Sequence, residues 1–150
     1  FGFKRTSVHD IGHQKVTDNG LKRAEARDVI RKFQVEQIAK LAKRLKSVPE
    51  GDGTMLDNTM IIYFSDTGEA HHSQRREWPF VVVGGRGHKM KIAGRYLRYP
   101  KYMNEGHKTI GNWYNTILRA NGGPNQDHFG QMDAKLKDLD LRGPLSELTV

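Results

Sequence analysis

Residues 57–85, DNTMIIYFSDTGEAHHSQRREWPFVVVGG, decide how this chain folds. The stretch contains two short apolar runs, within residues 59–64 and at 80–83, and a polar segment separates them. Apolar runs of this length, bounded by turn residues, are typical of strands that are covered on both faces. We therefore predict two buried strands joined by a loop. In open α/β sheets, ligands bind just beyond the carboxyl ends of such strands, so we expect any chemistry to lie in this loop.

Residue types that bind metals are dense in the predicted loop, namely Asp66, Glu69, His71 and His72. A second group of the same kind lies near the N-terminus: His9, Asp10 and His13. Imidazoles with carboxylates suit zinc, manganese or iron, whereas carboxylate-rich sets suit magnesium or calcium. A hydrolytic metal site needs several such ligands from different segments and an open position for water or substrate. The two groups are candidates for one site, although a single histidine is more often a surface or hydrogen-bonding residue.

The remaining chain predicts helices around these strands. Apolar residues recur three or four positions apart along residues 21–47, which indicates an amphipathic helix, and Asp18 or Asn19 is a candidate cap. A second helix is predicted over residues 110–121, with Thr109 as its cap. Basic and apolar residues alternate over 86–99, which favours a hairpin or edge strand rather than core. The leucines of residues 125–150 are expected to dock on the body.

The order helix, short loop, buried strand is the second half of a βαβ unit. Its first strand would lie before residue 1, and the chain begins FGFKRTSV without an initiator Met. We therefore expect a single α/β domain over residues 1–150, or the C-terminal fragment of a larger α/β domain.

Composition excludes several kinds of chemistry. The 150 residues contain no cysteine, so disulfides, thiolate metal sites and a cysteine nucleophile are ruled out. No apolar run approaches the roughly 20 residues of a membrane span. The motifs G-x-S-x-G and H-E-x-x-H are absent. Residues 84–87, GGRG, match a phosphate loop only loosely and are better interpreted as glycines that end a buried strand at a turn.

The formal net charge of +8 indicates affinity for an anionic partner, or simply a solvated basic face. The basic residues gather on the predicted helix of residues 21–47, so an anionic ligand at this basic helix is one candidate partner. No aromatic residues are interleaved with them as a base-stacking platform would require.

Several motifs resemble the C-terminal half of the alkaline phosphatase and sulfatase superfamily. Asp57-Asn58-Thr59, a hydrophobic strand, and Ser65-Asp66-Thr67-Gly68-Glu69 follow one another in the superfamily's order. His72 and the segment 78–84, WPFVVVG, look like its later metal-ligand histidine and the strand after it. Further similarity, at 51–59, 94–97 and 129–130, is to bacterial, often exported domains of unknown function related to sulfatases.

The resemblance implies the C-terminal part of an alkaline-phosphatase-like sandwich, with mostly parallel buried strands flanked by helices, incomplete by itself. It implies that Asp66 and His72, or His71, bind a divalent metal (zinc, calcium, magnesium or manganese). The segment 9–13, HDIGH, resembles the superfamily's D-x-x-G-H ligand pair, with His9 in place of the usual Asp and Asp10 beside it. The superfamily's nucleophile motif has no counterpart here. It would come from the remainder of the chain or from a companion polypeptide.

Three functions follow as expectations. The first is the metal-binding part of an exported hydrolase that acts on phosphate or sulfate esters. The second is a catalytically inactive, sulfatase-like exported scaffold or interaction protein, because His9 and Thr67 depart from the family pattern. The third is a protein that binds nucleic acid or another anionic polymer through the basic helix.

Overall fold

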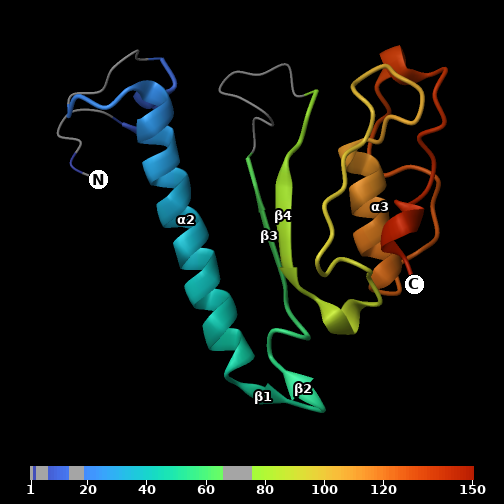
Figure 1. The fold of residues 1–150 in the computed structure, drawn as a ribbon. Helices are drawn as coiled ribbons and strands as arrows, with labels where there is room; N and C mark the ends of the chain where they lie inside the picture. The colour runs from blue at the N-terminus through green and yellow to red at the C-terminus, as the bar shows by residue number, and fades with distance from the viewer. Residues whose placement is uncertain (1, 3–6, 14–18, 66–75) are drawn as a thin grey trace. The chain divides into compact units, whose positions relative to one another are not determined.

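The computed structural model describes residues 2, 7–13, 19–65 and 76–150, which form two compact units, Phe1–Arg44 and Leu45–Val150. Figure 1 shows the elements in chain order. The first unit contains the short helix α1 (Val8–Ile11) and nearly all of the long helix α2 (Arg23–Lys46). The second contains two small sheets, the helix α3 (Ile110–Ala120) and three 3-10 turns.

The bounds of helix α2 agree with the helix predicted over residues 21–47, but the predicted apolar face is buried only at Ala26 and Ile30, while Val29, Phe33 and Leu41 are exposed. The entry of α2 is fixed by side chains, because the N–H of Lys22 donates to Glu25 Oε2 at 2.8 Å. The predicted cap Asn19 accepts a hydrogen bond from the N–H of Leu21 at 3.3 Å, just before the helix begins. Ala26 and Ile30 are buried on one side of the first turns, where they form a small core with Ile11 of α1.

Two strands form where they were predicted, β3 (Met60–Phe64) and β4 (Phe80–Gly84), but the prediction that both are buried is wrong. Most of their residues are half-buried, and Phe64 and Val81 are exposed. The two strands pair antiparallel, with Met60 opposite Gly84 and Phe64 opposite Phe80. A second, smaller antiparallel pair, β1 (Pro49–Glu50) and β2 (Gly53–Thr54), precedes them. Both sheets of the described chain are two-stranded and antiparallel, and no parallel strand pair is found among the described residues. The alkaline-phosphatase-like sandwich of mostly parallel strands stays a prediction. One α/β domain over residues 1–150 stays a prediction as well.

The base of this hairpin is a joint between two sequence motifs, Asp57-Asn58-Thr59 and the glycines after β4. Gly84 has φ +84°, and a Cβ there would lie 2.3 Å from the carbonyl oxygen of Thr59, so only glycine fits. The N–H of Gly85 donates to that same oxygen at 2.8 Å, and Gly87 donates to Asp57 O at 2.8 Å. The glycines therefore end a strand at a turn, as predicted, and their N–H groups are used within the chain.

The segment after the joint contradicts the hairpin or edge strand predicted over residues 86–99. It forms a 3-10 turn, η1 (Arg86–His88), and then irregular chain in which Lys89 and Gly94 adopt left-handed conformations that interrupt a strand. Met90 is buried and pairs with Thr149 as an isolated antiparallel bridge. The alternation of basic and apolar residues therefore marks single side chains that reach the core.

Helix α3 carries the core of the second unit, as its predicted apolar spacing requires. Trp113 is buried with Met90, Leu145 and Leu148, and its ring lies 4.7 Å from that of Phe80. Met60, Ile62, Phe80 and Val82 of the hairpin pack on this cluster. Four of the five C-terminal leucines are buried, Leu136, Leu141, Leu145 and Leu148, which confirms that the C-terminal residues dock on the body.

Side chains of α3 hold the C-terminal segment, residues 141–150, in place. The amide nitrogen of Asn112 donates to Leu141 O at 2.8 Å and to Gly143 O at 3.0 Å. Thr116 Oγ1 accepts a hydrogen bond from the N–H of Leu145 at 2.8 Å. Both side chains are buried, so irregular chain is fixed here by polar groups that have no water to compete for them.

In the described part of the chain, no helix combines the length and the apolar character needed to cross a bilayer.

Candidate metal centre

The predicted ligands fall into two sets, and the structure describes one of them. His9, Asp10 and His13 lie on and just after α1. Asp66, His71 and His72 lie outside the described residues, so their predicted role as ligands stays a prediction. Among the residues that are described, no group of three or more His, Asp or Glu side chains is arranged to hold a metal ion. The described part of the candidate centre is therefore a pair of imidazoles.

Local backbone structure brings His9 and His13 together. The N–H of Gly12 donates to His9 O at 2.9 Å and that of His13 to Asp10 O at 2.9 Å, which extends the turn of α1 through His13. Residues four apart in a helical turn share one side, so the two rings meet. Their centroids are 5.0 Å apart, and their Nε2 atoms are 3.3 Å apart.

The distance between the two Nε2 atoms suits shared coordination. Two nitrogen ligands of a tetrahedral zinc ion, each about 2.0–2.1 Å from the metal, lie about 3.3–3.4 Å from one another. The observed 3.3 Å is in that range. It also suits a hydrogen bond in which one Nε2–H donates to the other Nε2. The pair can thus hold its geometry before a cation arrives, and it supplies two of the nitrogen donors that zinc and manganese accept.

Asp10 is engaged in a capping box at the start of α1. Its Oδ2 accepts hydrogen bonds from Ser7 Oγ at 2.6 Å and from Ser7 N at 3.3 Å, while its own N–H donates to Ser7 Oγ at 3.1 Å. Hydrogen bonds from the Ser7 hydroxyl, and then from the Ser7 N–H, hold the pKa of Asp10 below its usual value. The carboxylate is therefore charged at neutral pH and directed at the helix start.

Two further contacts fix α1 at its other end. Ile11 is 1% exposed and packs with Ala26, which is 0% exposed, and with Ile30. The guanidinium of Arg23 donates from Nη1 to Gly12 O at 3.2 Å. Sequence reasoning missed Ser7 and Arg23. The spacing Ser7-x-x-Asp10 is a capping-box signal that points to Ser7, whereas the contact between Arg23 and Gly12 depends on how α1 packs on α2 and leaves no local signal.

Asp57 and Asn58, which belong to the motif that resembles one of the sulfatase superfamily, lie in the hairpin joint. Asp57 Oδ2 accepts hydrogen bonds from the N–H and the hydroxyl of Thr54, both at 2.8 Å. The side-chain bond from Thr54, and then the backbone bond, lower the pKa of Asp57. Asn58 Nδ2 donates to Glu50 Oε2 at 2.8 Å. These residues therefore build the turn that leads into β3.

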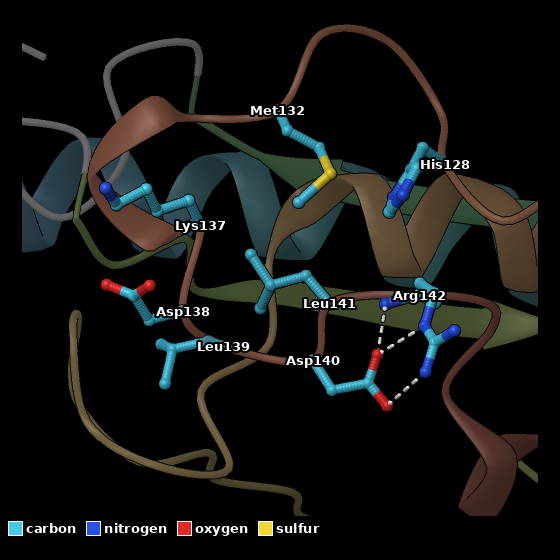
Figure 2. A pocket seen from close by; sticks show the side chains of 8 residues that line it. All are labelled: His128, Met132, Lys137, Asp138, Leu139, Asp140, Leu141 and Arg142. Carbon is cyan, nitrogen blue, oxygen red and sulfur yellow. Dashed lines mark hydrogen bonds and ion pairs between the residues drawn. The ribbon is translucent and has the colours of Figure 1, made fainter.

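A pocket of about 370 Å³ lies in the C-terminal unit, and Figure 2 shows its lining: His128, Met132, Lys137, Asp138, Leu139, Asp140, Leu141 and Arg142. Arg142 Nε lies 2.9 Å from Asp140 Oδ1, so these two charges neutralise one another. Lys137 and Asp138 lie at the opposite end of the pocket from His128 (Figure 2). Its polar groups do not converge on one point, so the imidazole pair is the stronger candidate site.

Comparisons of the chain with family models, with curated proteins and with solved structures find no match in any of the three.

Proposed function

We propose that this chain is the metal-binding part of a sulfatase- or phosphatase-like hydrolase acting on phosphate or sulfate esters, with His9 and His13 as two ligands of a divalent metal. The observation that carries the proposal is the 3.3 Å separation of the two Nε2 atoms on one helical turn. The motif resemblance of residues 57–72 adds the reaction class. The attacking nucleophile belongs to the remainder of the chain or to a companion polypeptide.

The donor chemistry narrows the metal. Imidazole nitrogens favour zinc or manganese over calcium, which takes oxygen ligands. Asp66, with His72 or His71, is proposed as a metal ligand separately, on the motif resemblance alone. Such an ion, when bound, would polarise an ester oxygen and balance negative charge in the transition state. His9 and His13 would provide two nitrogen donors at a fixed spacing and leave the other coordination positions of the metal open.

Two subsidiary proposals come from the sequence. Export to the periplasm or the cell exterior rests on the resemblance to bacterial exported domains. An anionic ligand at the basic helix rests on cations that are exposed along α2, among them Lys40, Lys43 and Arg44. This second proposal is the weaker one, because basic faces are usually solvated, and Arg31 already pairs with Asp28 at 3.6 Å.

The test is a titration of the metal-free, full-length protein with Zn²⁺ and with Mn²⁺, followed by calorimetry. We compare wild type with a variant carrying His9→Gln and His13→Gln together, and with His128→Gln as a control at an exposed histidine. Wild type and the control should bind one of the two ions stoichiometrically. The double variant should bind it more than about 100-fold more weakly, which exceeds the usual effect of losing an outer partner alone.

Hydrolysis is measured on the same proteins with aryl phosphates and aryl sulfates, with and without a chelator. Turnover that requires the metal and is lost in the double variant supports the proposal. The absence of stoichiometric metal, or equal affinity in wild type and double variant, contradicts the metal site. Tight binding without any turnover contradicts the hydrolase and favours the inactive scaffold instead.

A further inference from the structure

We infer that Ser7, Asp10 and Arg23 are positioning residues that clamp α1 at both ends and so set the spacing of the His9–His13 pair. The inference rests on the proposed function, in which the two imidazoles bind a metal. It also gives Asp10 a different role from the one that sequence similarity implies: Asp10 holds the turn that carries the ligands and does not bind the metal itself.

A clamp is needed because α1 is only four residues long. Fixing the first turn of a helix costs several backbone torsions for very few hydrogen bonds, so isolated helices shorter than about 12 residues are marginal in water. A metal site tolerates displacements of only about 0.5 Å in its ligands. The turn that carries His9 and His13 must therefore be stabilised by contacts from outside its own backbone.

The first contact is the capping box at the N-terminal end. Ser7 and Asp10 satisfy one another's N–H groups, Asp10 N to Ser7 Oγ at 3.1 Å and Ser7 N to Asp10 Oδ2 at 3.3 Å. The Ser7 hydroxyl donates to the same Oδ2 at 2.6 Å. Both donors go to the same oxygen of Asp10, Oδ2, so this oxygen is engaged in the capping box. The same box opens α3, where Asn112 stands in the position of Asp10 and accepts from Thr109.

The second contact is at the C-terminal end, where α2 reaches back to α1. Arg23, the first residue of α2, donates to the carbonyl of Gly12, which lies between Ile11 and His13. Next to it, Ile11 is sealed against Ala26 and Ile30. Because His13 directly follows Gly12, the Arg23 hydrogen bond restrains the ring that must stay beside His9. Both ends of the clamp belong to the same compact unit, so its geometry is internal to that unit.

The experiment measures Zn²⁺ affinity and the Co²⁺ absorption spectrum of the full-length protein in two sets of variants. Ser7→Ala, Asp10→Ala and Arg23→Gln remove the clamp contacts. Ser7→Thr and Asp10→Asn preserve them, since threonine is also a good cap, and Asn112 shows that an amide serves at the same position. Controls on α2 are Glu36→Ala and Arg31→Gln, and circular dichroism confirms that each variant is folded.

Removing a clamp contact should weaken Zn²⁺ binding by about 3- to 30-fold, the range expected for loss of a helix cap. It should also change the Co²⁺ bands, which report the ligand geometry. The preserving variants and the controls should match wild type. If Asp10→Asn weakens binding as much as Asp10→Ala while Ser7→Ala leaves it intact, then Asp10 is a ligand and the inference is overturned.

Two other outcomes separate this inference from the proposed function. Wild type that binds Zn²⁺, together with clamp variants that bind it equally well, overturns the positioning role and leaves the metal site standing. Wild type that binds neither ion contradicts the proposed function, and the inferred role of the clamp falls with it.

Discussion

The two helices α1 and α3 open with the same kind of capping box, yet the boxes do different work. At α1 the pair is Ser7 and Asp10, both exposed or nearly so, and the third position is a carboxylate. At α3 the pair is Thr109 and Asn112, and Asn112 is 1% exposed. Both boxes satisfy the first N–H groups of a helix. Only the second also holds a distant part of the chain.

The chemistry of the third box residue explains the difference. A carboxylate only accepts hydrogen bonds, so Asp10 can accept from Ser7 in the local turn but cannot donate to a carbonyl elsewhere in the chain. An amide has two further N–H donors, and Asn112 gives them to Leu141 O and Gly143 O. Asn at this position can therefore join a helix start to a remote segment, whereas Asp stabilises the helix alone. A carboxylate belongs where the turn is exposed, and an amide where carbonyl groups must be satisfied in the interior.

The largest expected effect is at the buried box. Asn112→Ala removes a cap and leaves two carbonyls of the C-terminal segment unsatisfied, so the free energy of unfolding should fall by about 3 kcal/mol. Asn112→Asp keeps the capping oxygen but turns a charge toward those carbonyls, so it should destabilise at least as much. Urea unfolding followed by tryptophan fluorescence measures both changes.

The capping box of α1 allows the reverse substitution at the matching position, Asp10→Asn. Asp10→Asn keeps the oxygen that accepts from Ser7, so the urea midpoint should stay at the wild-type value, and so should that of Asn125→Ala at an exposed position. Equal losses from Asn112→Asp and Asp10→Asn would break the distinction between the two boxes.

A smaller effect is expected one turn further along α3. Thr116 is 0% exposed, and its hydroxyl both accepts from the N–H of Leu145 and donates to Asn112 O at 2.7 Å. Thr116→Val keeps the shape of the side chain and strands a buried N–H, which should cost about 1–3 kcal/mol. Thr149→Val removes an exposed hydroxyl that donates to Ser146 O and should cost less than about 0.5 kcal/mol. Similar losses of unfolding free energy in the two variants would mean that burial does not determine the strength of the hydrogen bond between Thr116 and Leu145.

The sequence predicted the elements well wherever a local pattern determined them. The apolar runs predicted β3 and β4 to within one residue, and helical spacing with Thr109 predicted α3. The prediction for residues 86–99 was wrong because Met90 is buried against Trp113, Leu145 and Leu148, which lie far along the chain. The roles of Asn112 and Thr116 were likewise not predictable, because their hydrogen-bond partners, Leu141 and Leu145, lie far along the chain.

The candidate site was predictable in the same uneven way. The sequence predicted His9 and His13 as candidate ligands, but it did not predict the helical turn of α1 that brings their rings together. The hydrogen bonds of Asp10 could have been expected from Ser7, three residues earlier, but not the contact from Arg23. Motif similarity predicted no structural role for Asp57 and Asn58. The structure shows that their side chains form hydrogen bonds that build the turn before β3.

The smallest expected effect concerns a tyrosine–carboxylate hydrogen bond that holds the C-terminal segment. The Tyr99 hydroxyl donates to the carboxylate of Glu147, and Arg95 donates to the Glu147 carbonyl. Burial, then the bond to Glu147, raise the pKa of Tyr99 well above its usual value. Burial raises the pKa of Glu147, but hydrogen bonds from Tyr99, its own backbone N–H and Ser146 outweigh it, so the net pKa is lowered.

These two pKa shifts predict that the stability of the segment falls at both acid and alkaline pH. The lowered pKa of Glu147 contributes stability that is present above about pH 4.3 and is lost as the pH falls through the folded value. The raised pKa of Tyr99 contributes stability that is present below about pH 10 and is lost as the pH rises toward the folded value. Tyr99→Phe should therefore cost about 0.5–1.5 kcal/mol at neutral pH and flatten both shoulders of the stability profile.

The profile is measured by urea unfolding at intervals from pH 3 to pH 11, with Tyr96→Phe as the control because Tyr96 is 88% exposed. Tyr102 and Asp133 form a similar pair with pKa shifts in the same directions, so the shoulders should shrink without vanishing. The side-chain amide of Asn112 does not titrate, so its hydrogen bonds to the C-terminal segment do not depend on pH. The hydrogen bond between Tyr99 and Glu147 does depend on pH. If Tyr99→Phe keeps the full acid shoulder, the bond to Glu147 does not stabilise the folded segment.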